Sequence, residues 1–346
     1  MSPTPDVSVV IPTFSRPDLV TRAVRSALAQ SHENIEVIVV IDGPDPATET
    51  ALAAIDDTRL RVIPLAEQGG AQAARNAGIG AARAEWTALL DDDDEWLPEK
   101  IAVQLGLARS AHVASPIVAS RLINRTPRAE LVMPRRLPAD GEPRSEYLTV
   151  RRGLFHGEGF VQTSTILAPT ELWRRVPFQV GLRRLHELDW TLRALGHDDV
   201  DLIVAEQPLV LWYTDEDRPR VSFQAPWQNQ LEWLRRSRPL LTKRAYAALA
   251  MSVVSSMAAT THSPKVFCTV LAEARRHGRP GLIDYVTYLQ IWLIPPRLRA
   301  ILRDRLLGRG RTARPAAAAP ATSRAAAHVP APRTAAAPER VGEHRP

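Results

Sequence analysis

Apolar, β-branched runs alternate with helix-forming segments over about the first 90 residues, and this alternation restricts the fold strongly. The runs Val7–Ile11 and Ile35–Ile41 are too apolar for half-exposed strands and are typical of central parallel strands covered on both faces. Between them, Pro17 and apolar residues at helical spacing up to Leu28 predict a helix. We therefore predict an α/β sheet whose parallel strands are joined by right-handed crossovers.

Further elements continue this pattern. Asp45-Pro46 supplies an N-cap and a first-turn proline for a helix through Ile55. The next predicted elements are a strand at Leu60–Ile63, a helix at Gln72–Ala82, a strand at Trp86–Leu90 and a helix from near Pro98. Beyond them the pattern is less regular, with strands near Ile117–Leu122, Thr165–Leu167 and Leu202–Val204, a helix near Leu188–Leu195, and helical sequence from Pro226 to about Arg276.

Composition limits the class of protein. The 346 residues are 45% hydrophobic and 24% charged, as in soluble globular proteins. A single cysteine, Cys268, excludes an intrachain disulfide framework and favours a reducing, cytoplasmic location. We expect neither a signal peptide nor a membrane span, because no suitable apolar stretch occurs. The net charge of +6 comes without a nucleic-acid-binding module, so we expect no nucleic-acid partner.

Four consecutive aspartates, Asp91 to Asp94, follow the apolar strand Trp86–Leu90. Clustered carboxylates repel one another and raise one another's pKa, so a protein that keeps several at a strand end often neutralises them with a divalent cation. All-oxygen ligands suit Mg²⁺ or Mn²⁺ better than zinc. The alternative is a solvated acidic turn that precedes the next helix.

Other polar residues follow the same edge of the predicted sheet. The first strand ends in Pro12, Thr13, Phe14 and Arg16, which suit a base or a ribose but are also common in such loops. Asp42 ends the second strand and either accepts a hydrogen bond from a ligand or closes a turn. The Gly69-Gly70 pair before the next helix resembles a phosphate-binding loop, and Arg75 and Asn76 follow it on that helix. The alternatives are a plain salt bridge for Arg75 and a surface amide for Asn76.

As an ordered set these motifs resemble the nucleotide-sugar-binding half of the family 2 glycosyltransferases. The set reads Val-Val-Ile-Pro-Thr-Phe-Ser-Arg, Val-Ile-Val-Val-Ile-Asp-Gly, Ala-Arg-Asn-Ala-Gly-Ile and Leu-Leu-Asp-Asp-Asp-Asp-Glu-Trp-Leu-Pro. The resemblance is close over about Val7 to Leu105 and looser to about Leu195. It implies a GT-A fold, in which a mostly parallel, twisted, Rossmann-like sheet is flanked by helices.

The resemblance also implies roles for individual residues. Thr13, Phe14, Asp42 and Arg75 fall where the family holds the nucleotide base and ribose, and Pro12 and Arg16 belong to the same loop. The family's Asp-x-Asp motif matches Asp91 and Asp93, which makes Asp93 the first candidate metal ligand and Asp91 the second. Asp91 or Asp92 would contact the ribose or the sugar. Relatives often carry another acid where this chain has Ile41, and a serine where it has Pro44, so base recognition is expected to differ.

The resemblance implies a catalytic base near the start of a later helix. The matching segment places Glu187 at that position, with Asp189 as the runner-up and a favourable first-turn charge as the structural alternative. The polar run 157–164 is expected to line the acceptor side. The implied activity is an inverting transfer from a nucleotide-diphospho-sugar to a hydroxyl of a glycan or lipid-linked acceptor. The rivals are a non-catalytic sugar-nucleotide-binding protein and a nucleotidyltransferase.

The C-terminal third carries an apolar helical face beside arginines. The face comprises Leu282, Tyr285, Val286, Leu289, Trp292 and Leu293, and residues 297–311 carry six arginines against the single acid Asp304. This resembles an interfacial helix at the inner face of the plasma membrane, and the alternative is a helix packed on the catalytic domain. We predict a catalytic domain at 1–222, a helical C-terminal extension at 223–311 and a disordered Ala/Pro-rich tail at 312–346.

Overall fold

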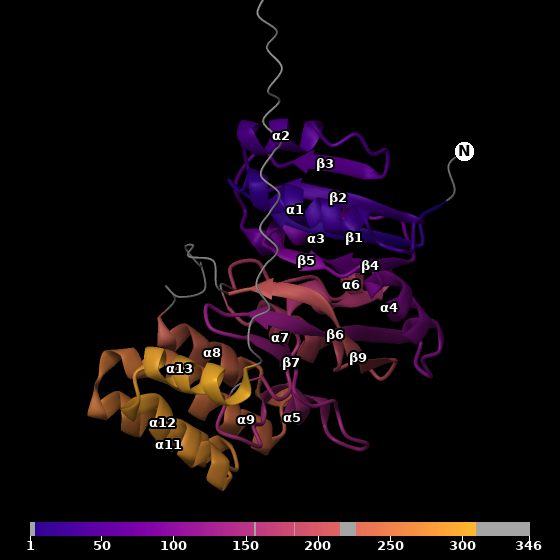
Figure 1. The fold of residues 1–346 in the computed structure, drawn as a ribbon. Helices are drawn as coiled ribbons and strands as arrows, with labels where there is room; N and C mark the ends of the chain where they lie inside the picture. Colours follow the sequence, from indigo (N-terminus) through magenta and orange to yellow (C-terminus); the bar gives the residue numbers. More distant parts are fainter. Residues whose placement is uncertain (1–3, 156, 183, 215–225, 309–346) are drawn as a thin grey trace, which may run out of the picture. The chain divides into compact units, whose positions relative to one another are not determined.

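Nine strands of the described residues form one sheet with helices on both faces (Figure 1). The computed structural model describes residues 4–155, 157–182, 184–214 and 226–308. The strand order is β3-β2-β1-β4-β8-β6-β9-β5, with β7 paired to β6. The first four strands are parallel, as predicted: β1 (Val7–Thr13), β2 (Ile35–Ile41), β3 (Leu60–Pro64) and β4 (Trp86–Leu89).

The second half of the sheet mixes parallel and antiparallel pairs. Its strands are β5 (Asp94–Trp96), β6 (Ser115–Arg125), β7 (Glu130–Met133), β8 (Leu167–Pro169) and β9 (Val200–Tyr213). Strand β6 runs parallel to β9 and antiparallel to β7 and β8, while β8 also pairs antiparallel with β4. Strand β5, which begins with the last of the four aspartates, pairs antiparallel with β9 and lies at the far end of the sheet order.

The α-helices of the described residues include each one predicted from the sequence. Those of the α/β part are α1 (Pro17–Leu28), α2 (Pro46–Ala53), α3 (Ala71–Ala81), α4 (Lys100–Arg109), α5 (Arg144–Thr149), α6 (Thr170–Arg175) and α7 (His186–Ala194). The C-terminal ones are α8 (Trp227–Arg236), α9 (Lys243–Leu249), α10 (Ser255–Ala258), α11 (Pro264–His277), α12 (Leu282–Leu293) and α13 (Pro296–Leu307), with a π-helical segment at Ala250–Val254.

Local sequence accounts for several helix starts. Pro17 opens α1, and the Asp45 carboxylate accepts a hydrogen bond from the backbone N–H of Thr48 at 3.2 Å, as expected for an N-cap. Helix α3 lies close against β1 and β2 because Gly78 has no side chain, and a Cβ there would collide with Val10. This close approach fixes the helix that carries Arg75 at the carboxyl edge of the sheet.

Two large apolar clusters pack on opposite faces of the sheet. Because side chains alternate along a strand, Val9 and Ile11 contact the cluster that holds α1, α2 and α4, while Val10 contacts the other. The second cluster continues through the stacked rings of Trp173 and Trp190, whose centroids lie 3.6 Å apart, into α8–α12. The C-terminal helices therefore share a core with the sheet.

The structure describes only part of the chain over which the domain limits were predicted. The described residues belong to one compact unit. The predicted boundary at 222/223 and the predicted disordered tail both lie outside the described residues. Among the helices that are described, none has the length and apolar character needed to cross a bilayer.

Candidate functional site

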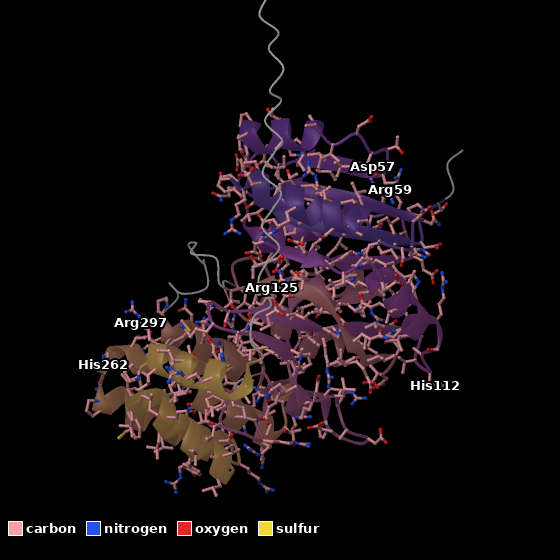
Figure 2. All side chains as sticks on the ribbon, in the orientation of Figure 1. Asp57, Arg59, His112, Arg125, His262 and Arg297 are labelled. Carbon is pink, nitrogen blue, oxygen red and sulfur yellow. The ribbon has the colours of Figure 1, made fainter. Side chains whose placement is uncertain are left out.

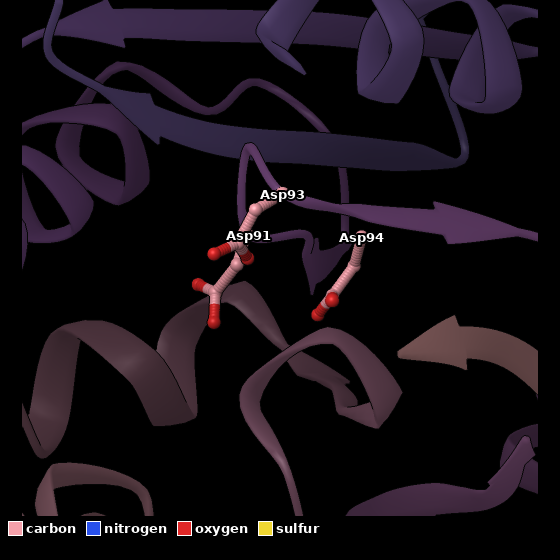
Figure 3. Close-up of side chains that lie close together, drawn as sticks. All are labelled: Asp91, Asp93 and Asp94. Carbon is pink, nitrogen blue, oxygen red and sulfur yellow. The ribbon is translucent and has the colours of Figure 1, made fainter. Parts of the chain in front are cut away.

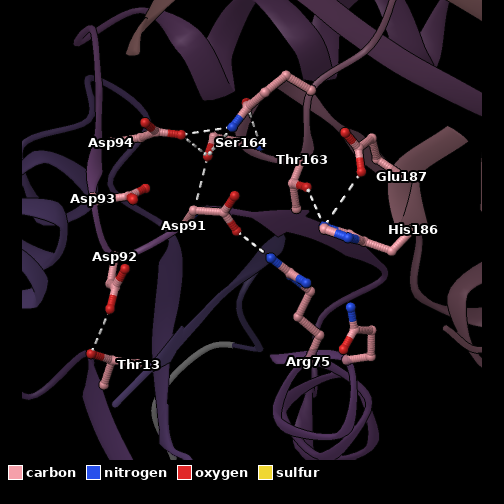
Figure 4. A network of polar contacts seen from close by, with 12 residues as sticks. Thr13, Arg75, Asp91, Asp92, Asp93, Asp94, Thr163, Ser164, His186 and Glu187 are labelled. Carbon is pink, nitrogen blue, oxygen red and sulfur yellow. Dashed lines mark hydrogen bonds and ion pairs between the residues drawn. The ribbon is translucent and has the colours of Figure 1, made fainter. Parts of the chain in front are cut away.

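The four consecutive aspartates form the turn after β4 and the first residue of β5, and their side chains point in different directions (Figure 4). A hydrogen bond of 3.1 Å from the backbone N–H of Asp94 to the carbonyl of Asp91 closes the turn. The turn follows β4, which pairs in parallel with β1. It therefore lies at the carboxyl ends of the parallel strands, where open α/β sheets bind their ligands.

Asp92 points toward the loop that follows β1. Its carboxylate accepts hydrogen bonds from the Thr13 hydroxyl at 2.9 Å and from the Arg16 guanidinium at 3.0 Å. Burial raises the pKa of Asp92 to about 6, although the charge of Arg16 opposes this shift. Phe14 is 36% exposed in the same loop, so its ring is accessible to a planar ligand, whereas Pro12 is buried within β1.

Asp91, Asp93 and Asp94 form a carboxylate cluster (Figure 3). One oxygen from each residue lies within 4.8 Å of the others. Ligands on opposite sides of an Mg²⁺ ion are about 4.2 Å apart, given bond lengths of about 2.1 Å, so the separation of these oxygens is close to that of ligands around one ion. The sequence predicted Asp91 and Asp93 as ligands, and the structure adds Asp94 to the candidates.

Asp94 is fully buried, and only one of its oxygens is engaged. That oxygen accepts from the Ser164 hydroxyl at 2.6 Å and from the Gln162 amide at 2.8 Å. The other oxygen, Oδ1, is buried with no hydrogen-bond partner among the described residues. Burial and the charges of Asp93 and Asp91 raise the pKa of Asp94 well above its ordinary value. An unpaired buried oxygen in an all-oxygen donor set fits Mg²⁺ or Mn²⁺, because a cation would offset this charge.

Arg75 brings a buried positive charge from α3 to the cluster. Its Nη2 lies 2.5 Å from a carboxylate oxygen of Asp91, which is the salt bridge that the sequence left as an alternative. Its Nε and Nη1 atoms are buried without hydrogen-bond partners among the described residues. The next residue, Asn76, exchanges two hydrogen bonds with the backbone of Phe178, whose ring lies 5.6 Å from the guanidinium. A guanidinium with two unpaired nitrogens can bind an anionic oxygen of a ligand.

Asp42 holds the loop that opens α3. Its two carboxylate oxygens accept from the backbone N–H groups of Gly69 at 2.8 Å and Gly70 at 2.9 Å. Gly70 has φ of 88°, a left-handed conformation that favours glycine. Asp42 thus closes a turn, the alternative that the sequence left open, and a ligand at this carboxylate would have to use its remaining lone pairs.

The predicted base, Glu187, lies in the first turn of α7. Its Oε2 atom is buried without a hydrogen bond among the described residues and lies 3.4 Å from Nε2 of His186. Burial lowers the pKa of His186, so this imidazole is neutral at pH 7 and the contact is not a salt bridge. The Thr163 hydroxyl lies 3.5 Å from the same ring nitrogen (Figure 4).

Asp189, the other predicted base, links two helices. Its oxygens accept from Nε of Arg193 at 2.8 Å and from the indole N–H of Trp233 in α8 at 2.9 Å. The carboxylate is buried, and each of its oxygens has a partner. Of the two predicted bases, Glu187 is therefore the one that retains an oxygen without a hydrogen bond.

Sequence reasoning missed two members of this site. Gln162 and Ser164 belong to the polar run expected to line the acceptor side, yet their side chains hold Asp94. Ser164 also accepts from the backbone N–H of Asp91 at 3.0 Å. The sequence carries no signal for this role, because the burial that makes a polar group need a partner is visible only in the structure.

With the fold and the acidic edge of the sheet described, comparisons with known proteins identify the fold type and the family. Among solved structures, the chain superposes on the S. aureus TarS fragment 1–349 in complex with UDP-GlcNAc with a TM-score of 0.54 and 16% identity, over 83% of this chain and 90% of that one. At this identity the likeness shows the fold, which is of the GT-A type, as predicted.

The family follows from the sequence comparison. Residues 8–163 match the model of glycosyl transferase family 2, so the chain carries a family 2 glycosyltransferase domain. The succinoglycan biosynthesis protein ExoO of Rhizobium meliloti is 44% identical over 107 residues, which are 31% of each chain. The putative teichuronic acid biosynthesis glycosyltransferase TuaG of Bacillus subtilis is 37% identical over 103 residues, 29% of this chain and 41% of that one. The chain thus spans less than half the length of these relatives.

Proposed function

We propose that this chain transfers a sugar from a nucleotide-diphosphate donor to an acceptor hydroxyl, with inversion at the anomeric carbon. The observation that supports this most directly is one polar network at the sheet edge (Figure 4). The network contains the carboxylate cluster, a buried arginine with unpaired nitrogens and a glutamate with an unpaired oxygen. These are the groups that a leaving diphosphate and an attacking hydroxyl require.

The donor would lie across the loops that follow β1 and β2. Phe14 and Thr13 would contact the base and ribose, and Arg75 would bind an oxygen of the diphosphate through its unpaired nitrogens. Asp91, Asp93 and Asp94 would hold Mg²⁺ or Mn²⁺. When bound, such an ion neutralises charge on the leaving diphosphate.

Glu187 would take the proton from the acceptor hydroxyl. Its carboxylate lies next to an imidazole that is neutral at pH 7, and its buried Oε2 atom has no hydrogen bond among the described residues. Positioned general bases contribute about 10²- to 10⁴-fold in rate. A direct attack on the face opposite the diphosphate needs no covalent nucleophile and inverts the configuration.

The donor and acceptor are proposed from the relatives. TarS was solved with UDP-GlcNAc, so a UDP-sugar is the first donor to test. ExoO and TuaG are named for succinoglycan and teichuronic acid biosynthesis, which makes a hydroxyl of a growing glycan or lipid-linked glycan the proposed acceptor. The single cysteine favours a cytoplasmic location for this reaction.

Calorimetric titration tests the site. UDP, dTDP and GDP would be added to the purified chain in Mn²⁺ or in EDTA, and the titrations repeated with Asp93→Ala. We expect one diphosphate to bind only with metal, and Asp93→Ala to abolish that binding. The control is Asp57→Ala, because Asp57 pairs with Arg59 beside β3 and belongs to no part of the site. Binding that ignores both the metal and Asp93 would contradict the proposal. A UDP-sugar that binds but releases no UDP in a turnover assay would favour a non-catalytic binder.

A further inference from the structure

Exposed apolar side chains gather on the last two helices. Of the eleven large apolar residues that are exposed in the described part of the chain, seven lie on α12 and α13. These seven, here called the leucine surface, are Leu282, Val286, Leu289, Leu293, Leu298, Leu302 and Leu306. Leu282 is 83% exposed and Leu293 is 75% exposed. Within each helix these residues are spaced three or four apart, so they lie on one face. A continuous exposed apolar face of this kind marks an interaction surface.

The opposite faces of both helices are anchored, so the exposure does not come from loose helices. In α12, Tyr288 is buried and donates to the carbonyl of Phe267 at 2.6 Å, while the Trp292 indole donates to Ser255 at 2.8 Å. The sequence placed Trp292 on the apolar face, and the structure uses it for packing. In α13, buried Asp304 accepts from Arg128 at 3.0 Å. Both helices are thereby held with their leucines outward.

The charge that this region presents to solvent is positive. Over residues 259–308 the three acids, Glu273, Asp284 and Asp304, are buried, and each pairs with an arginine. The exposed charged residues of the same stretch are cationic: Lys265, Arg275, Arg276, Arg279, Arg297 and Arg305. Figure 2 shows Arg297 and His262 at the same end of the unit, away from Asp57 and Arg59. Arg297 and Arg305 lie on α13 beside the exposed leucines.

Two other occupants of the leucine surface are disfavoured. In a symmetric dimer the same patch would meet itself, which would bring the exposed arginines of two copies together. The sequence that follows the described part, 309–346, offers only Val329 and Val341 as apolar residues larger than alanine and proline. It also carries seven arginines against two glutamates, so it adds positive charge.

We propose that the leucine surface docks on an anionic lipid bilayer, with α12 and α13 in the plane of the interface. Leucines that enter the acyl boundary beside arginines that meet anionic headgroups give a helix its affinity for such a surface. This inference is independent of the proposed sugar transfer, because it needs only the C-terminal helices. The residues proposed to bind the bilayer lie on the exposed faces of α12 and α13, which do not contribute to the core of the protein.

Vesicle co-sedimentation of the full chain tests the proposal. Vesicles of phosphatidylcholine alone would be compared with equimolar phosphatidylcholine and phosphatidylglycerol. We expect binding to the anionic vesicles, with a partition coefficient that falls about tenfold or more in Leu289→Gln/Leu293→Gln, because two exposed leucines that would enter the acyl boundary are lost. Arg297→Gln/Arg305→Gln is expected to cost about fivefold per charge. Salt of about 0.5 M should weaken binding of the unmodified chain.

The matched control is Val62→Gln/Arg25→Gln, which removes an exposed apolar residue and an exposed arginine from the α/β part and should bind as the unmodified chain does. Circular dichroism would verify that each variant is folded. Unchanged binding of the leucine variant would overturn the proposal. Equal binding of the unmodified chain and the arginine variant to neutral vesicles would also overturn it. Sedimentation equilibrium that shows a dimer of the unmodified chain and a monomer of the leucine variant would assign the surface to a second copy instead.

Discussion

Each of the four consecutive aspartates has its own environment, and chemistry at the scale of single residues follows from these differences. Asp92 is buried against Thr13 and Arg16, whereas Asp91 faces Arg75 and Asp94 faces Ser164. The identical side chains therefore differ in the charged groups and hydrogen-bond donors that surround them. The sequence could indicate that the run forms a site, but it could not distribute the roles, because the partners lie 16 to 79 residues away along the chain.

Substitutions at the two candidate bases should separate chemistry from structure. We expect Glu187→Gln to lower kcat by about 10²- to 10⁴-fold while leaving metal-dependent diphosphate binding unchanged. Asp189→Asn should act mainly on stability, by about 1–3 kcal/mol, because it disturbs hydrogen bonds from Arg193 and Trp233. Turnover assays and thermal unfolding of both variants provide the measurements. A fully active Glu187→Gln beside an inactive, stable Asp189→Asn would move the base to Asp189.

A second residue, Glu36, should make stability depend on pH. Burial alone would raise its pKa, but hydrogen bonds from Ser8, Arg61 and Arg83 lower it below the ordinary value. The folded state therefore favours the ionised form, so this contribution is present above the unfolded pKa of about 4.5 and is lost as pH falls through the folded pKa.

Glu36→Gln is expected to lower the free energy of unfolding by about 1–3 kcal/mol at pH 7. The difference from the unmodified chain should shrink as pH falls below the unfolded pKa. Urea unfolding across this pH range provides the measurement, with the exposed Glu49→Gln on α2 as the control. A deficit that stays constant with pH would mean that the charge of Glu36 does not stabilise the fold.

At the scale of elements, local patterns predicted the parts of the sheet that are buried on both faces. β1 and β2 are fully buried, so their apolar runs stand out in the sequence. β5 consists of Asp94, Glu95 and Trp96 and carries no strand signal, because its pairing with β9 determines it. β9 is longer than the predicted Leu202–Val204 for the same reason: its further residues pair with β6 and β5. Long-range pairing is the information that a single sequence lacks.

Two glycines of α3 give a matched test of how this helix positions Arg75. A Cβ at Gly78 would meet Val10 and Val40, whereas nothing lies within 4 Å of the corresponding position at Gly80. Gly78→Ala should therefore destabilise the fold by about 1–3 kcal/mol through overpacking and weaken diphosphate binding. Gly80→Ala should stabilise it by about 0.5–1 kcal/mol, as a glycine replaced within a helix. Chemical unfolding and titration calorimetry would measure both, and equal effects would show that α3 can shift freely on the sheet.

At the scale of the whole molecule, one core joins the sheet to the C-terminal helices. The cluster that contains Val10 of β1 also contains Met251 and Tyr288. The α/β half and the helices that carry the leucine surface therefore depend on the same apolar contacts. A sequence with separate α/β and helical regions suggested an extension, and the continuity of the core became visible only when distant segments were placed together.

A core substitution in the helical part should consequently destabilise the α/β half as well. Met251 is fully buried, so Met251→Ala is expected to cost about 2–5 kcal/mol and to lower the unfolding midpoint of residues 4–308 as one transition. Hydrogen exchange in β1 should accelerate with that in α9, because one cooperative unit opens. Leu289→Ala on the exposed face of α12 serves as the control, and its free energy of unfolding should stay within about 0.5 kcal/mol of that of the unmodified chain. Two separate transitions in Met251→Ala, with β1 still protected in the first, would show instead that the helices fold independently of the catalytic half.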